Sequence, residues 1–140
     1  MLHPTRARCL ILVAALGLHA LWGCPDNAPE RAFDVFYRAL QRGDVDTAWA
    51  SLSQRTRTAL EGVVARATPP GAVSRPAQQV LFEQGMLAPM REILSVQVLN
   101  RAGEQATLQV EDEAEQKQQI TMVLEQGEWR VVLPVPESGA

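Results

Sequence analysis

The spacing of apolar residues changes near Glu92, and this change constrains the fold more than any other feature of the chain. Before Glu92, apolar side chains recur every three or four residues, which is typical of amphipathic helices. After it, they alternate with polar side chains, which is typical of strands with one buried face. Helices followed by strands predict an α+β domain, in which N-terminal helices pack on a twisted antiparallel four-stranded meander.

The first helix is expected over 29–42, where apolar residues recur at helical spacing. Pro29 suits the first turn of a helix, and Gly43 suits a left-handed cap after its last turn. The predicted inward stripe consists of Phe33, Phe36, Tyr37 and Leu40.

Further helices are expected before Glu92. Asp44 is expected to cap a short helix over 44–53, and a third helix starts at Ser53 or Thr56. The prolines and glycine of 68–76 predict a loop, and 77–84 predict one or two further helical turns that end at Gly85. The residues expected to face inward are Val45, Ala48, Trp49 and Leu52, and then Leu60, Val63, Val64 and Ala67.

Four strands are expected after Glu92, each with alternating apolar residues. Glycine-containing turns at 101–103 and 126–127 predict hairpins, so the strands pair antiparallel in sequence order. The inward residues are Leu94, Val96 and Val98; Ala106, Leu108 and Val110; Ile120, Met122 and Leu124; and Trp129, Val131 and Leu133. The opposite face, expected to meet water, carries Gln97, Thr107, Gln109 and Arg130.

The first 24 residues have the pattern of a leader. Arg6 and Arg8 precede an apolar run that ends at Trp22, and Gly23 and Cys24 follow it. The run is shorter than the ~20 residues that a membrane-spanning helix needs. An ordinary secretory signal in which Cys24 is incidental, or an uncleaved short anchor, also fits this pattern.

The four residues Leu21-Trp22-Gly23-Cys24 resemble the lipobox of bacterial lipoproteins. The resemblance implies cleavage before Cys24 and lipid attachment to that cysteine, with three acyl chains in many Gram-negative bacteria. More than one chain gives stable anchoring. The membrane is then a partner through Cys24, and the domain belongs to the cell envelope, facing the periplasm or the exterior. The choice between inner and outer membrane stays open.

The chain therefore divides into a signal peptide over 1–23, a lipidated tether over 24–28, a single domain over 29–135 and a frayed tail over 136–140. Both histidines and one of the two cysteines lie before Cys24. Their position excludes Ser-His-Asp and Cys-His catalysis, imidazole zinc sites and an internal disulfide from the domain. From Cys24 onward the chain has 11 basic and 16 acidic residues, so its net charge is negative. A negative net charge disfavours nucleic acid as a partner.

Two segments resemble the nuclear transport factor 2-like superfamily, also called the cystatin-like α+β cone. PERAFDVFYRALQRGDVDTAWASLS (29–53) is similar to the first two helices of that family, and GEWRVV (127–132) is similar to its last strand. The resemblance implies a curved sheet wrapped over helices, with an apolar hollow between them. These patterns are architectural and imply no activity.

Four aromatic residues are candidates to line such a hollow: Phe33, Tyr37, Trp49 and Trp129. The ketosteroid isomerases and polyketide cyclases of the superfamily use an acid or histidine base with a tyrosine or acid donor, and Tyr37 is the only tyrosine here. The inward strand positions are all apolar, so no partner base for Tyr37 is evident. Packing is the simpler role for all four residues, and we assign no catalytic residue and no cofactor.

One dense acidic cluster is expected at the turn between the second and third strands, and it consists of Glu111, Asp112, Glu113 and Glu115. Carboxylates can hold a hard cation, but this spacing lacks the glycine and alternating ligands of a calcium loop. A solvated turn is the favoured interpretation, and no metal is predicted.

Three functions remain open from the sequence. The favoured one is a membrane-tethered, non-enzymatic binding or scaffolding module for a small apolar ligand or an envelope protein. The second is an isomerase-like or cyclase-like enzyme that uses Tyr37 in an apolar hollow. The third is a structural part of an envelope complex. An open cavity favours binding of a small ligand, whereas a filled core favours assembly with a protein.

Overall fold

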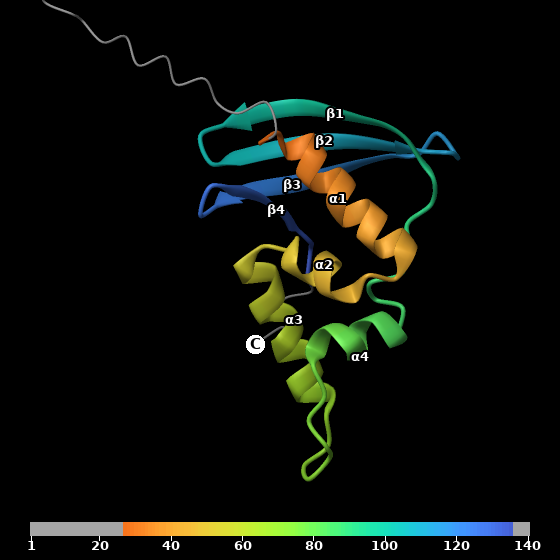
Figure 1. The fold of residues 1–140 in the computed structure, drawn as a ribbon, viewed down its shortest axis with the longest axis vertical. Helices are drawn as coiled ribbons and strands as arrows, with labels where there is room; N and C mark the ends of the chain where they lie inside the picture. Colours follow the sequence, from red (N-terminus) through yellow and green to blue (C-terminus); the bar gives the residue numbers. More distant parts are fainter. Residues whose placement is uncertain (1–26, 136–140) are drawn as a thin grey trace, which may run out of the picture.

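A computed structural model describes residues 27–135; the predictions for the leader, for Cys24 and for the tail over 136–140 lie outside these residues. Within the described part, four helices precede four strands that pair antiparallel in the order β1-β2-β3-β4. The helices are α1 (Pro29–Arg42), α2 (Val45–Ala50), α3 (Gln54–Ala67) and α4 (Ala77–Glu83), and the strands are β1 (Ile93–Ala102), β2 (Gln105–Asp112), β3 (Lys117–Glu125) and β4 (Glu128–Val132). The helices lie on one side of the sheet (Figure 1). The predicted α+β class and meander order are confirmed.

Helix α1 forms over the residues that its apolar spacing predicts. Phe33, Phe36 and Leu40 are buried, and Tyr37 is half-buried beside them. Gly43 follows the helix with a φ of 68°, a left-handed conformation that glycine adopts without a side-chain clash. The predicted bounds and the predicted cap are both confirmed.

Side-chain caps begin α2 and α3. The Asp44 carboxylate accepts a hydrogen bond from the Thr47 amide at 3.1 Å, and the Ser53 hydroxyl accepts one from the Thr56 amide at 3.2 Å. Each cap satisfies an amide that has no partner inside its helix. The cap at Asp44 is confirmed, and Ser53 rather than Thr56 begins the third helix.

The inward faces of the next two helices differ in part from the expectation. Ala48, Leu52, Leu60 and Val64 are buried as predicted. Val45, Trp49 and Val63 are half-buried. The prediction for Ala67 is wrong: it is exposed, because the end of α3 extends away from the sheet toward the loop that leads to α4 (Figure 1).

The inward set predicted for β1 is wrong at Leu94 and only partly right beyond it. Leu94 is 63% exposed and Val98 is 37% exposed, whereas Ile93 packs against the core. The pairing of β1 with β2 shifts register between Ile93 and Ser95, so an extra residue reverses the alternation there. Because a bulge has no periodic signature, the sequence pattern does not reveal it.

The remaining strands follow their predicted alternation. Ala106, Leu108 and Val110 of β2 are all buried, as are Met122 of β3 and both Trp129 and Val131 of β4. Ile120, Leu124 and Leu133 are half-buried against the same core.

The two hairpin turns lie at one end of the sheet. The β1–β2 turn is Gly103-Glu104, slightly later than the predicted 101–103, because β1 continues to Ala102. The β3–β4 turn is Gln126-Gly127 as predicted, and both residues have positive φ, 53° and 82°. Two successive positive φ values define the type I′ turn that suits the twist of a hairpin.

The segment that joins α2 to α3 covers the β4 edge of the sheet. Leu52 forms a parallel bridge with Val131, whose amide donates to the Ser51 carbonyl at 2.9 Å and whose carbonyl accepts from the Ser53 amide at 2.9 Å. Arg130 also donates to the Ala50 carbonyl at 2.7 Å. These bonds attach the helical layer to the sheet through the backbone as well as through side chains.

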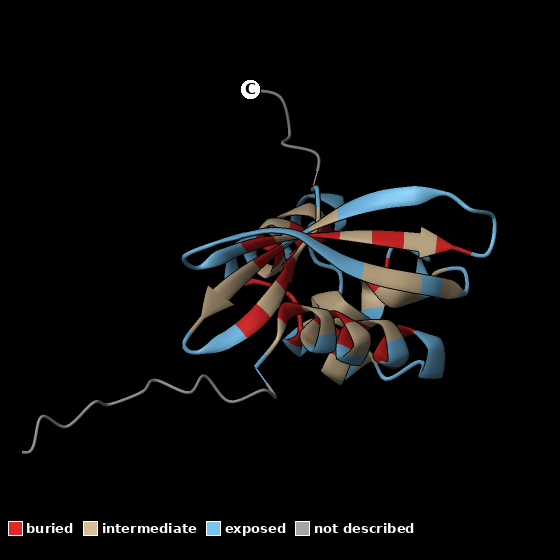
Figure 2. Cartoon of the chain, turned by 90° about the horizontal axis from the view of Figure 1, so that it is seen from above, coloured by how far each residue is buried: buried red, intermediate tan, exposed pale blue. Residues whose placement is uncertain are grey.

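One apolar core lies between the helices and the sheet. In Figure 2, buried positions on the strands and on α1 face one another across this layer. The largest buried side chains include Phe33, Leu52, Leu81, Leu108 and Met122. None of the helices within 27–135 has the length and apolar character that crossing a membrane requires.

Candidate functional site

The four aromatic candidates do not share one cavity. Phe33 and Trp129 are 1% and 3% exposed and belong to the core, and Tyr37 and Trp49 pack half-buried against it. Phe33 and Tyr37 line one surface cleft and Trp129 lines another, while Trp49 lies outside both. The space between the helices and the sheet is therefore filled by side chains where these residues meet.

The Tyr37 cleft is a small hollow of about 140 Å³ between α1 and the start of β1. The Tyr37 hydroxyl accepts a long hydrogen bond from the Ile93 amide at 3.4 Å. Asp34 lines the same cleft, but its side chain is 49% exposed and pairs with Arg38 at 2.9 Å. A solvated, ion-paired carboxylate is poorly placed to act as a general base beside the tyrosine.

The Trp129 cleft lies where the chain enters the domain. Its volume is about 370 Å³, and its lining includes Asn27, Arg31, Glu128 and Arg130. Asn27 donates from its side chain to the Gly127 carbonyl at 2.9 Å, so the start of the described chain is attached to the β3–β4 turn. The buried indole nitrogen of Trp129 has no hydrogen-bond partner among the described residues.

The side chain of Arg101 lies over the ring of Trp129. The Arg101 guanidinium lies 5.0 Å from the centre of the Trp129 ring, within the range of a cation–π interaction. This contact connects the end of β1 to β4 across the hairpin end of the sheet.

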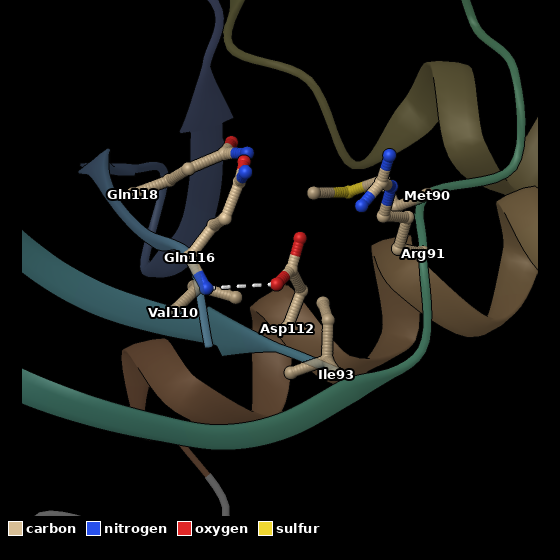
Figure 3. Close-up of a pocket in the computed structure, with 7 residues that line it drawn as sticks. All are labelled: Met90, Arg91, Ile93, Val110, Asp112, Gln116 and Gln118. Atoms are coloured by element: carbon tan, nitrogen blue, oxygen red, sulfur yellow. Dashed lines mark hydrogen bonds between the residues drawn. The ribbon is translucent and has the colours of Figure 1, made fainter. Parts of the chain in front are cut away.

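A third pocket, with polar and charged groups, lies at the end of the sheet that carries the β2–β3 turn, opposite the two hairpin turns. Figure 3 shows the residues that line it. Its volume is about 290 Å³. The lining residues are Met90, Arg91, Ile93, Val110, Asp112, Gln116 and Gln118. The sequence gives no signal for this pocket, because its polar groups come from four separate segments. Arg91 lies before β1, Asp112 ends β2, Gln116 lies in the β2–β3 turn and Gln118 lies in β3.

Asp112 is the buried carboxylate of this pocket, at 8% exposure. One of its oxygens accepts hydrogen bonds from the Ala114 and Gln116 amides, both at 2.9 Å. Its other oxygen points into the pocket, on the side of Arg91 and Gln118 (Figure 3). The first oxygen holds the turn, and the second faces the pocket.

The acidic cluster divides into residues with different roles. Asp112 organises the turn, and Glu111 lies 3.9 Å from the Lys117 ammonium. Glu113 and Glu115 are exposed. Within residues 27–135, no group of three or more histidine, cysteine or acidic side chains is arranged to hold a metal ion.

The fold defines a two-layer α+β domain with an antiparallel meander, and the clefts lie on its surface. Comparison with known proteins finds no match for this chain among protein-family models, curated proteins or solved structures.

Proposed function

We propose that this chain is a membrane-tethered lipoprotein of the cell envelope, and that it acts as a non-enzymatic binding or scaffolding module for an envelope protein. The filled layer between helices and sheet carries this proposal. Core residues such as Phe33, Leu108 and Met122 occupy the space that a small apolar ligand would need. We therefore assign partner binding to the outer surface of the domain, which a protein can contact.

The tether is supported by the sequence before the domain. The lipobox-like residues end at Cys24, and Asn27, whose side chain binds the Gly127 carbonyl, lies three residues later. Three residues extend at most about 10 Å. A lipid on Cys24 would therefore hold the hairpin end of the sheet close to the membrane surface.

We also propose that the fold is the nuclear transport factor 2-like cone. Two observations support it: the helices precede the meander, and α1 lies against the inner face of the sheet (Figure 1). The proposal concerns architecture and adds no activity to the chain.

The isomerase-like or cyclase-like alternative has weaker support. Tyr37 and Asp34 line one cleft, but the hydroxyl accepts a backbone amide and the carboxylate pairs with Arg38. Both groups therefore have partners within the domain. Tyr37→Phe is expected to leave the function of the full chain in the envelope unchanged. Loss of that function in a Tyr37→Phe chain that still folds would favour the isomerase-like or cyclase-like enzyme.

Metabolic labelling with palmitate tests the anchor. We expect label on the wild-type chain and none on Cys24→Ser. Cys9→Ser is a matched control within the leader, and it should keep the label because Cys9 lies before the expected cleavage point. An unlabelled wild-type chain, or equal label on Cys24→Ser, would refute the tether.

Native mass spectrometry of the full chain purified from its own membranes tests the kind of partner. We expect the mass of the processed polypeptide with its acyl groups and no further small molecule. An apolar molecule bound at one copy per chain would contradict the assignment to a protein partner, because it would require space inside the core.

A further inference from the structure

Two oppositely charged side chains, Asp112 and Arg91, line the pocket of Figure 3 without forming an ion pair with each other. The second oxygen of Asp112 accepts no hydrogen bond within residues 27–135, although the side chain is 8% exposed. The Arg91 guanidinium makes neither a hydrogen bond nor an ion pair in the same part of the chain. We propose that this pocket binds a free aliphatic α-amino acid, with its ammonium group on Asp112 and its carboxylate on Arg91.

The two charges together select a zwitterion. A carboxylate removed from water is stabilised by a positively charged partner. A cation alone would satisfy Asp112 but would face the guanidinium of Arg91, and an anion alone would face the carboxylate of Asp112. A molecule that carries both an ammonium and a carboxylate satisfies both side chains through charge-assisted hydrogen bonds. An α-amino acid carries these two groups on one carbon atom.

The rest of the lining suits the other parts of such a ligand. The amide groups of Gln116 and Gln118 lie on the wall of the pocket (Figure 3), where they can donate to a carboxylate or accept from an ammonium. Met90, Ile93 and Val110 add apolar surface for an aliphatic side chain. The volume of about 290 Å³ lies just below the ~300–1,000 Å³ of sites for drug-sized ligands, so the pocket suits a single amino acid.

Backbone hydrogen bonds hold the walls of the pocket in place. The Gln41 side chain donates to the Met90 carbonyl, which attaches the segment before β1 to the end of α1. The Glu113 amide donates to the Glu92 carbonyl at 2.9 Å, which attaches the β2–β3 turn to the same segment. Because these walls are already in position, binding costs little reorganisation.

The proposal goes beyond the function proposed above and depends on neither the lipid on Cys24 nor a protein partner. In a small pocket at the surface, two charge-assisted hydrogen bonds are expected to give a Kd of about 1 mM. A ligand of that affinity dissociates during purification, so it would be absent from the mass spectrum of the purified chain. Failure of this proposal would leave the palmitate and mass spectrometry experiments unaffected.

A two-dimensional NMR titration of the full chain in detergent with L-leucine tests the site. The Ala114 and Gln116 amides are the reporters, because both donate to the Asp112 carboxylate. We expect their signals to shift and to reach saturation. The Thr47 amide is an internal control, because it donates to the carboxylate of Asp44, outside the pocket, and its signal should not move. The absence of a saturable shift up to about 20 mM, some twenty times the expected Kd, would overturn the proposal.

Two analogues of L-leucine test whether both charges of the ligand are needed. L-leucinamide keeps the ammonium and lacks the carboxylate, whereas 4-methylpentanoate keeps the carboxylate and lacks the ammonium. We expect each analogue to bind at least ten-fold more weakly than L-leucine, because one charge of the pocket is then left without a partner. If either analogue binds as tightly as L-leucine, the pocket does not recognise a zwitterion.

Three variants test the residues. Asp112→Asn removes the charge and keeps an oxygen for the two turn amides, and Arg91→Gln changes an exposed side chain without a bonding partner among residues 27–135. Both should bind L-leucine at least ten-fold more weakly. Glu113→Gln is the matched control, because it removes a negative charge from the same turn but does not line the pocket. Unchanged binding in Arg91→Gln, or equal weakening in Glu113→Gln, would refute the assignment.

Discussion

Asp44 shows how one side chain connects local structure to pH dependence. Hydrogen bonds from Thr47, from its side chain first and its backbone amide second, lower the pKa of Asp44 below its ordinary value of 3.8. The ionised carboxylate is therefore favoured in the folded chain. Such a group stabilises the fold above its unfolded pKa, and the contribution is lost as pH falls through the folded pKa.

We expect a two-dimensional NMR titration to place the pKa of Asp44 below 3.8 in the folded chain. Thr47→Val removes the side-chain donor and keeps the backbone amide, so the pKa of Asp44 should move part of the way back upward. Asp44→Asn should remove this contribution to the loss of stability in acid. A wild-type pKa at or above the ordinary value would contradict the cap as described.

Single residues also mark where sequence reasoning succeeds. Pro29, Gly43, Asp44 and Ser53 act through local backbone chemistry, and their effect on helix bounds can be predicted from neighbouring residues alone. The role of Asp112 could not be predicted, because its partners depend on the shape of a turn.

At the scale of elements, the β3–β4 turn contains a residue that is poorly suited to its conformation. Gln126 has a φ of 53°, a region that side chains rarely occupy, although asparagine tolerates it. Asn-Gly is the preferred pair in a type I′ turn.

Gln126→Asn is therefore expected to raise the free energy of unfolding by about 0.5 kcal/mol, because it relieves strain in the left-handed region. Urea denaturation measures the change. Gln119→Asn in β3 is the matched control, and it should be neutral or slightly destabilising because asparagine is disfavoured in strands. Equal shifts in both variants would contradict the turn as the cause.

The helices and strands also show where the spacing of apolar residues fails to predict which side chains are buried. Helix α1 and the strands β2, β3 and β4 follow the predicted spacing because each has one continuous buried face. β1 departs from it at Leu94, because a bulged edge strand is only partly covered by α1. The pocket lined by Arg91 and Asp112 could not be predicted either, since its lining comes from three strands, from the segment before β1 and from the β2–β3 turn.

The helical layer is attached to the sheet by the backbone at β4 as well as by the apolar core. Val131 is fully buried, and both of its backbone groups bond to the segment between α2 and α3. The sequence does not predict this parallel bridge between Leu52 and Val131. The two residues are far apart in the chain, and the residue pattern around neither of them indicates which segment it pairs with.

Val131→Ala is expected to lower the free energy of unfolding by about 2 kcal/mol, through lost burial and a residual cavity. Val73→Ala makes the same chemical change at an 87% exposed site and should shift it by less than about 0.5 kcal/mol. Thermal or urea unfolding compares the two. Similar losses in both variants would mean that Val131 does not lie in the core.

The attachment of Asn27 to Gly127 has a consequence for how a lipid-anchored copy meets its bilayer. In an antiparallel meander, the turns at Gly103 and Gly127 share one end, and the acidic β2–β3 turn stands at the other (Figure 1). The eight residues of β2 separate these ends by about 27 Å, several Debye lengths at physiological ionic strength. An anchored domain would thus carry its densest negative charge where anionic headgroups no longer repel it.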